Sequence, residues 1–128
     1  MKDGRRATGA AGEQAAVIFL EARGYGILAR NWRCARGELD IIAQDGRELV
    51  FIEVRTKRGT AYGSAEESIT AVKRRRLVRL AGLYLDQLRE AGTPWQGPWR
   101  IDVVGVQIDG RGQMAINHLP HALEGAYS

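Results

Sequence analysis

Cysteine, proline and long apolar runs are all scarce in this sequence. Cys34 is the only cysteine among 128 residues, which excludes an internal disulfide and a cluster of thiolate metal ligands. We expect Cys34 to be inert packing in a reducing cytoplasm. No apolar run approaches the roughly 18 residues of a membrane span, and no apolar segment follows the charged N-terminus as in a secretory signal. We therefore expect a cytoplasmic protein with no membrane partner.

The composition is otherwise that of an ordinary globular protein. Apolar residues make up 45% of the chain and charged residues 27%. We expect a single domain over residues 1–128, with residues 1–8 as a mobile tail. The formal net charge is +4, and positive charge is concentrated in "KRRRLVR", residues 73–79. A cationic excess suits a nucleic-acid partner without establishing one.

Periodicity and turn residues predict the order of the elements. Thr8 could cap a helix that runs through "GAAGEQAAVIFLEAR" and ends before Gly24. "YGILARNWRC", "ELDIIA" and "ELVFIEV" predict three strands. A helical pattern follows over residues 65–91, where Thr70 could be a fresh N-cap, and "RIDVVGVQI" and "MAINHL" predict a second hairpin. The expected fold class is α/β with one sheet, in the order α-β-β-β-α-β-β.

The first hairpin carries acids at unexpected positions. If Asp45-Gly46 forms its turn, Asp40 opposes Phe51 and Glu38 opposes Glu53. Side chains alternate between the faces of a strand, so one face is apolar throughout. The other face carries charged residues toward one end: Glu38, Asp40, Glu53, Arg55 and Lys57.

Two carboxylates about 5 Å apart repel by roughly 3 kcal/mol at an effective dielectric of 20, and by less than about 1 kcal/mol in water. Either this end of the hairpin is solvated, or a divalent cation lies between the acids. Mg²⁺ fits the second interpretation because it uses one or two carboxylates and keeps several waters.

Several stretches of the sequence carry a resemblance to a known family: "GEQAA", "NWRCARGELDIIAQDG", "VFIEVRTK", "YGSAEESITAVKRRRL" and "RIDVVGV". Over nearly the whole chain they resemble the YraN-like family of small bacterial proteins. That family is assigned to the PD-(D/E)XK nuclease superfamily, near the archaeal Holliday junction resolvases. The resemblance implies a restriction-endonuclease-like fold, with one mixed sheet of about five strands flanked by helices.

The resemblance also implies roles for individual residues. The metal-binding acids that it implies are Asp40, Glu53, Glu13 on the first helix and, less directly, Glu38. The superfamily lysine is replaced by Arg55, which cannot be deprotonated and so cannot be a general base. Lys57 or Lys73 could reach the site instead.

The leading hypothesis is an Mg²⁺- or Mn²⁺-dependent endonuclease acting on DNA, branched or structured, in which Arg55 and Lys57 stabilise charge on the phosphate. The residues expected to contact nucleic acid are Lys73, Arg74, Arg75, Arg76 and Arg79. One alternative is a non-catalytic nucleic-acid-binding domain that retains the nuclease fold, and another is a protein-interaction domain. The resemblance also raises a homodimer as a hypothesis.

Three further features have two interpretations each. Asp102 could support the site from its edge, but we favour a plain polar residue at a strand end. His118 and His121 are separated by a proline that breaks any helix, so we do not expect a histidine metal site. Trp95 and Trp99 could stack on unpaired bases, although anchoring a connector to the core is the favoured role.

Overall fold

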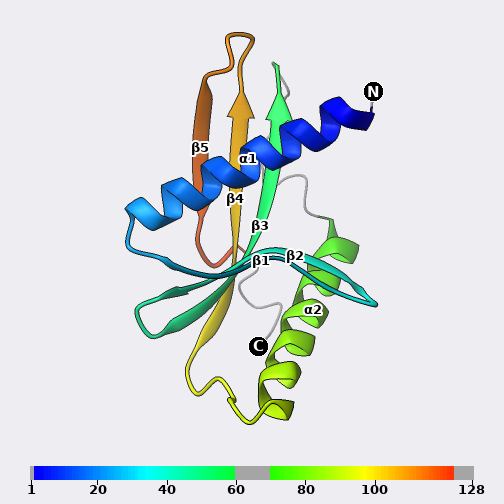
Figure 1. The fold of residues 1–128 in the computed structure, drawn as a ribbon, viewed down its shortest axis with the longest axis vertical. Helices are drawn as coiled ribbons and strands as arrows, with labels where there is room; N and C mark the ends of the chain where they lie inside the picture. Colours follow the sequence, from blue (N-terminus) through cyan, green and yellow to red (C-terminus); the bar gives the residue numbers. More distant parts are fainter. Residues whose placement is uncertain (1, 60–69, 123–128) are drawn as a thin grey trace.

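A single mixed sheet organises the computed structural model, which describes residues 2–59 and 70–122 (Figure 1). The elements are α1 (Lys2–Ala22), β1 (Gly26–Cys34), β2 (Gly37–Asp45), β3 (Glu48–Arg58), α2 (Ala71–Glu90), β4 (Trp99–Ile108) and β5 (Met114–Leu119). The predicted order is therefore confirmed. The strands lie side by side in chain order, and every neighbouring pair is antiparallel except β3 and β4, between which α2 occurs in the chain.

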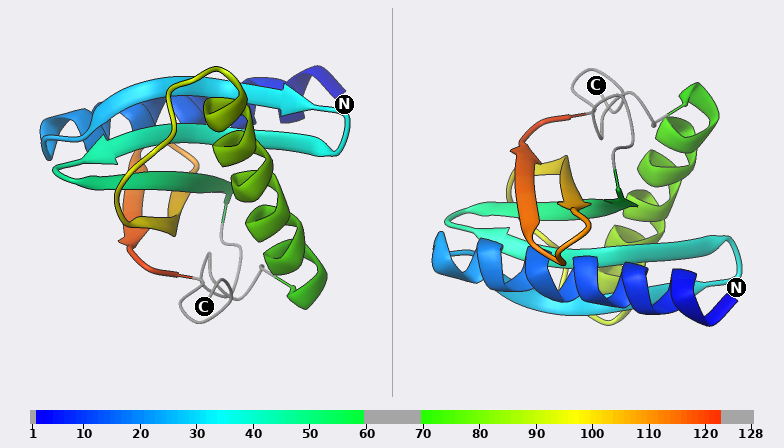
Figure 2. Two further views of the ribbon diagram at one scale, coloured as in Figure 1. Left: turned by 90° about the horizontal axis from the view of Figure 1, so that it is seen from below. Right: turned by 90° about the horizontal axis from the view of Figure 1, so that it is seen from above.

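The two helices cover opposite faces of the sheet (Figure 2). Ala16, Val17 and Leu20 of α1 belong to one buried cluster with the strands. Leu77 and Leu80 of α2 belong to a second cluster on the other face. The second face of the hairpin was predicted to carry charge only toward one end, and α2 covers the apolar remainder of that face. Burial on both sides also explains why the central strands read as nearly continuous apolar runs.

The turn between β2 and β3 lies one residue later in the chain than predicted. This shift moves the pairing partner of each β2 residue by two positions along β3. The central residues of the turn are Gly46 and Arg47, and Gly46 has φ 59° at the first position, where a two-residue hairpin turn requires a positive φ. Asp45 therefore pairs with Glu48 and Ile41 with Ile52. A shift of two leaves the alternation of faces intact. It changes the partners, however, so the predicted pairs of Asp40 with Phe51 and Glu38 with Glu53 were wrong.

Both helix starts can be compared with their predictions. Thr70 is the N-cap of α2, as predicted, and its side chain accepts a hydrogen bond from the Lys73 backbone nitrogen at 3.2 Å. The predicted helical residues 65–69 lie outside the described ranges. The start of α1 was wrong, because the helix begins at Lys2 rather than after Thr8. The Thr8 hydroxyl instead accepts from the Arg58 guanidinium at 3.2 and 3.3 Å. The mobility of residues 1–8 stays a prediction.

Within the described ranges, neither helix is long and apolar enough to cross a membrane.

Close contact between α1 and β3 depends on Gly12. A Cβ atom at this position would lie 2.0 Å from the Thr56 hydroxyl oxygen, so only glycine allows the helix to approach this strand. The contact fixes the height of the next residue, Glu13, above the sheet. A buried glycine on an apolar helix face is thus a positioning feature of the fold.

We expect Gly12→Ala to lower the free energy of unfolding by about 1–3 kcal/mol, because the added methyl group overpacks the interface. Gly9→Ala is the matched control, since a Cβ there meets nothing within 4 Å. It should instead stabilise the helix by up to about 1 kcal/mol. Urea denaturation of both variants measures the difference. Equal effects of the two substitutions would contradict the close approach.

Candidate functional site

The candidate site lies where β2 and β3 separate. Their pairing ends at Ile41 and Ile52. Beyond this point β2 remains paired with β1 as far as Gly37, whereas β3 remains paired with β4 as far as Arg58. The sheet therefore forks, and one step into the fork lie Asp40 on β2 and Glu53 on β3.

The side chain of Asp40 bridges β2 and β3 at the point where the two strands separate. Its Oδ2 accepts a hydrogen bond of 2.8 Å from the backbone nitrogen of Val54, whose donor would otherwise face the gap between the strands. Its carboxyl group also lies close enough to that of Glu53 for the two groups to interact directly. Two carboxyl groups can share a hydrogen bond only if one of them holds a proton.

The pKa of Asp40 indicates which of the two carboxyl groups holds that proton. Burial first, and then the charge of Glu53, raise the pKa of Asp40 to about 8, with a smaller contribution from Glu13 and against the effect of the Val54 hydrogen bond. Asp40 is therefore largely protonated at neutral pH. Strong perturbation by burial and a specific charged neighbour is typical of functional sites.

The other acids of the site lie beside arginines. Arg55 Nη1 is 3.5 Å from Glu53 Oε2, and the Glu53 side chain is only 12% exposed. Arg30 Nη2 lies 3.8 Å from Glu13 Oε1, while its Nη1 donates to Gln14 Oε1 at 2.9 Å. Arg30 thus ties α1 to β1 beside the fork. It was missed in the sequence because nothing there distinguishes it from a solvated strand arginine.

Two further predicted residues take different places. Glu38 accepts a 2.7 Å hydrogen bond from Arg33 Nε across β1 and β2, so the geometry gives no support to its role as a ligand beside Glu53. Lys57 lies two residues beyond Arg55 on β3 and therefore on the same face.

For a divalent cation, the fork offers two carboxylate ligands rather than a complete set of protein ligands. The described part of the chain holds no group of three or more His, Cys, Asp or Glu side chains arranged for a metal ion. Two carboxylates still fit Mg²⁺, which is commonly bound by one or two of them together with waters and substrate phosphate. The donor atoms at the fork are hard oxygens, as such ions require.

The basic residues of α2 lie mainly on the face of the helix that is turned away from the sheet and exposed to solvent. Lys73 is half-buried, and the four arginines are exposed: Arg74, Arg75, Arg76 and Arg79. The helix packs beside the start of β2, since a Cβ at Gly37 would lie 3.4 Å from Leu80 Cδ1. The basic surface is therefore carried by an element that adjoins the strand of Asp40.

A second charged cluster was not predicted. Asp102 is fully buried and accepts hydrogen bonds from Arg100 Nε and the His121 backbone nitrogen, both at 3.0 Å, while His118 Nε2 lies 2.8 Å from its Oδ2. Burial alone would raise the pKa of Asp102, but the bonds from His118, Arg100 and His121 lower it overall. Arg100 also contacts Glu48, Asp45 and the Tyr25 hydroxyl.

The favoured interpretation of Asp102 as a plain strand-end residue was therefore wrong. A signal existed in the sequence: Arg100 and Asp102 lie two residues apart in an apolar strand and so share one face. This cluster faces the α1 side through Tyr25, and its charges are mutually satisfied. We therefore assign the cluster a structural role, and removing one partner of its buried pair should cost about 3–5 kcal/mol.

The fold and the fork together define a class: a small α/β protein with a buried carboxyl pair between two strands. The chain belongs to the uncharacterised protein family UPF0102, whose family model matches residues 12–106. This is the YraN family, so the resemblance seen in the sequence is confirmed.

Curated relatives cover most of the chain. A UPF0102 protein of Herpetosiphon aurantiacus is 50% identical over 118 residues, which is 92% of this chain and 94% of that protein. One of Symbiobacterium thermophilum is 55% identical over 108 residues, covering 83% and 88%. Among solved structures, SfsA of Pyrococcus furiosus in complex with Ca²⁺ has a TM-score of 0.41 at 17% identity, over 90% of this chain and 64% of that one. A likeness of that size carries no argument about function.

The raised pKa of Asp40 predicts a stability that depends on pH. The folded protein keeps a proton at Asp40 that the unfolded chain loses above pH about 4. In the presence of EDTA, the free energy of unfolding should therefore fall as the pH rises from about 4 to 8, by at most about 1.4 kcal/mol per pH unit. Asp40→Asn should remove this loss and be the more stable form at pH 8.

Urea denaturation across this pH range is the measurement, and Glu38→Gln is the control because Glu38 lies on the same strand as Asp40 but pairs with Arg33 of β1. An advantage of Asp40→Asn that stays constant from pH 5 to 8 would contradict a shared proton.

Proposed function

We propose that this protein is a metal-dependent endonuclease that acts on DNA, on branched or otherwise structured substrates. The observation that carries the proposal is the close pair of carboxyl groups, Asp40 and Glu53, at the fork where β2 and β3 separate. A buried pair of acids costs free energy, and a proton held only by burial and a neighbouring anion is readily replaced by a cation.

Mg²⁺ or Mn²⁺ is the cofactor that this pair suits. Asp40 and Glu53 would hold the ion, and Glu13 would add negative charge from α1. When bound, the ion would generate a nucleophilic water and neutralise charge on the phosphodiester. Binding requires the Asp40 proton to leave, so we expect affinity for the ion to rise with pH up to about 8.

The cations of β3 would act on the substrate phosphate. Arg55 keeps its charge at every accessible pH and therefore suits stabilisation of a phosphate rather than proton transfer. Its 3.5 Å contact with Glu53 places it at the pair. Lys57, on the same face, is the group that could supply a second positive charge.

The exposed arginines of α2 are the proposed contacts to the DNA backbone. Such contacts release counterions from DNA, so binding should weaken steeply with salt. The packing of Leu80 against Gly37 supports this placement, because it sets the basic helix beside the strand that carries Asp40.

A second candidate function is nucleic-acid binding without catalysis. The observation that favours it is Arg55, which stands where the superfamily has a lysine and lies beside Glu53. In that case the acids would be a remnant, and only the basic surface would matter. Binding would be salt-dependent, without turnover, and unchanged by Glu53→Ala.

Cleavage assays with Mn²⁺ on nicked, forked and four-way DNA test the proposal. Asp40→Ala should lower the rate by about 100-fold or more, because a charge-stabilising site loses one of its two essential acids. Glu38→Ala, on the same strand but paired with Arg33, should retain most of the activity. Wild-type activity no greater than that of Asp40→Ala on every substrate would contradict the nuclease proposal.

The same preparations separate the two candidates. Combined replacement of Arg74, Arg75 and Arg76 by alanine should weaken DNA binding under either function. Retained binding with no turnover, insensitive to Asp40→Ala and Glu53→Ala, would favour the binding domain.

A further inference from the structure

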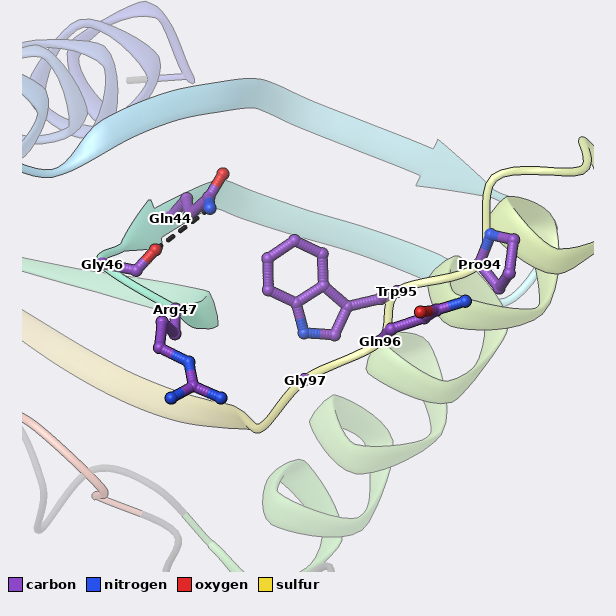
Figure 3. A pocket seen from close by; sticks show the side chains of 7 residues that line it. All are labelled: Gln44, Gly46, Arg47, Pro94, Trp95, Gln96 and Gly97. Carbon is purple, nitrogen blue, oxygen red and sulfur yellow. Dashed lines mark hydrogen bonds between the residues drawn. The ribbon is translucent and has the colours of Figure 1, made fainter.

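A hollow of about 440 Å³ lies between the β2–β3 turn and the connector from α2 to β4 (Figure 3). We call it the Trp95 hollow, and its lining residues are Gln44, Gly46, Arg47, Pro94, Trp95, Gln96 and Gly97. Its volume falls within the roughly 300–1,000 Å³ of small-ligand sites. The turn residue Arg47 and the acid Glu53 lie six positions apart on the chain through β3, so this hollow is separate from the fork.

Trp95 packs against the second buried cluster, so the favoured interpretation as an anchor of the connector is confirmed, and the same side chain also lines the hollow. The indole of Trp95 projects from the connector toward the β2–β3 turn, with Gln44 on one side and Arg47 on the other (Figure 3). Its Nε1 donates to the Pro98 carbonyl at 2.9 Å, and the same carbonyl accepts from the Leu49 nitrogen at 3.1 Å. The ring is therefore held before any ligand arrives, which lowers the entropic cost of stacking on it.

The charge of the hollow is positive. Asp45 and Glu48 flank the turn, but both side chains bind Arg100 on the opposite face, at 3.2 and 2.8 Å. None of the residues that line the hollow is acidic. Across the described ranges, the Arg47 guanidinium has no hydrogen bond or ion pair, so its donors are available to an anion.

We propose that the Trp95 hollow binds one unpaired nucleotide, with its base stacked on the indole and its phosphate on Arg47. A rigid aromatic face suits a flat base of any sequence, and a lone guanidinium suits a phosphate. The Gln44 amide nitrogen donates to the Gly46 carbonyl at 3.0 Å, so the Gln44 amide oxygen and the Gln96 amide are the groups that could bind a base edge (Figure 3). If the bound nucleotide is an unpaired position of a DNA substrate, the inference rests on the proposed function. It then narrows the substrate to DNA that contains single-stranded nucleotides. A free mononucleotide offers the same chemistry.

Binding of a labelled single-stranded thymidine oligonucleotide and of a blunt duplex, followed by fluorescence anisotropy, tests the proposal. Trp95→Leu and Arg47→Gln should each weaken single-strand binding about 5-fold or more, the lower limit for loss of one stacked base. Duplex binding should change less than about 2-fold, because paired bases are not available to stack. Trp95→Phe should retain most of the single-strand affinity.

Arg111→Gln is the matched control for charge, because Arg111 is exposed in the β4–β5 turn, away from the hollow. A loss on Arg47→Gln no larger than that on Arg111→Gln would overturn the proposal. So would equal losses for single strand and duplex on Trp95→Leu, in protein whose thermal unfolding shows that it is folded.

Competition by thymidine monophosphate distinguishes the two sources of the nucleotide. Strong competition supports a site for free nucleotides, and competition by the oligonucleotide alone supports a site for a DNA strand. The cleavage assay separates this inference from the proposed function. If cleavage depends on Asp40 but Trp95→Leu does not change single-strand binding, only the nucleotide site is overturned. If single-strand binding depends on Trp95 but no cleavage is seen, the nucleotide site stands and the proposed nuclease activity is overturned.

Discussion

The contact between the carboxyl groups of Asp40 and Glu53 is the constraint on which the functional account depends. It arises because β2 pairs with β3 only from Ile41 onward, so that the side chain of Asp40, rather than a backbone carbonyl, receives the Val54 donor. A serine or asparagine could satisfy that donor without a charge penalty. An acid next to another acid lowers the stability of the metal-free fold, and a strained or costly local arrangement is expected at a functional site.

Two charged clusters in the described part of the chain show opposite ways of accommodating a buried carboxyl group. Around Asp102, cationic and neutral donors satisfy the carboxylate, and its pKa is lowered. Around Asp40, burial and other acids dominate, and the pKa is raised. Both clusters contain acids and arginines at similar spacing in their strands. At the fork, one acid holds a proton that a cation could replace, which is why the fork and not the Arg100 cluster is the candidate site.

Much of the fold could be predicted from the sequence, because periodicity and turn residues determine the elements locally. The order of the helices and strands along the chain, the cap at Thr70 and the charged end of one face were all accessible in this way. The register was not, since Asp45-Gly46 favours a turn one residue earlier than the one formed at Gly46 and Arg47. The error spared the fork because an even shift keeps Asp40 and Glu53 on one face. Asp102 was misjudged because burial at a strand end depends on β5 and α1, which no local pattern reveals.

The shared proton is the central claim, and carboxyl ¹³C NMR of Asp40 observes it directly. In protein freed of metal with EDTA, the account predicts a titration midpoint near pH 8. Mg²⁺ should displace the midpoint to lower pH by competing with the proton. A midpoint of about 4, the value of an ordinary aspartate, that Mg²⁺ does not move would contradict the account.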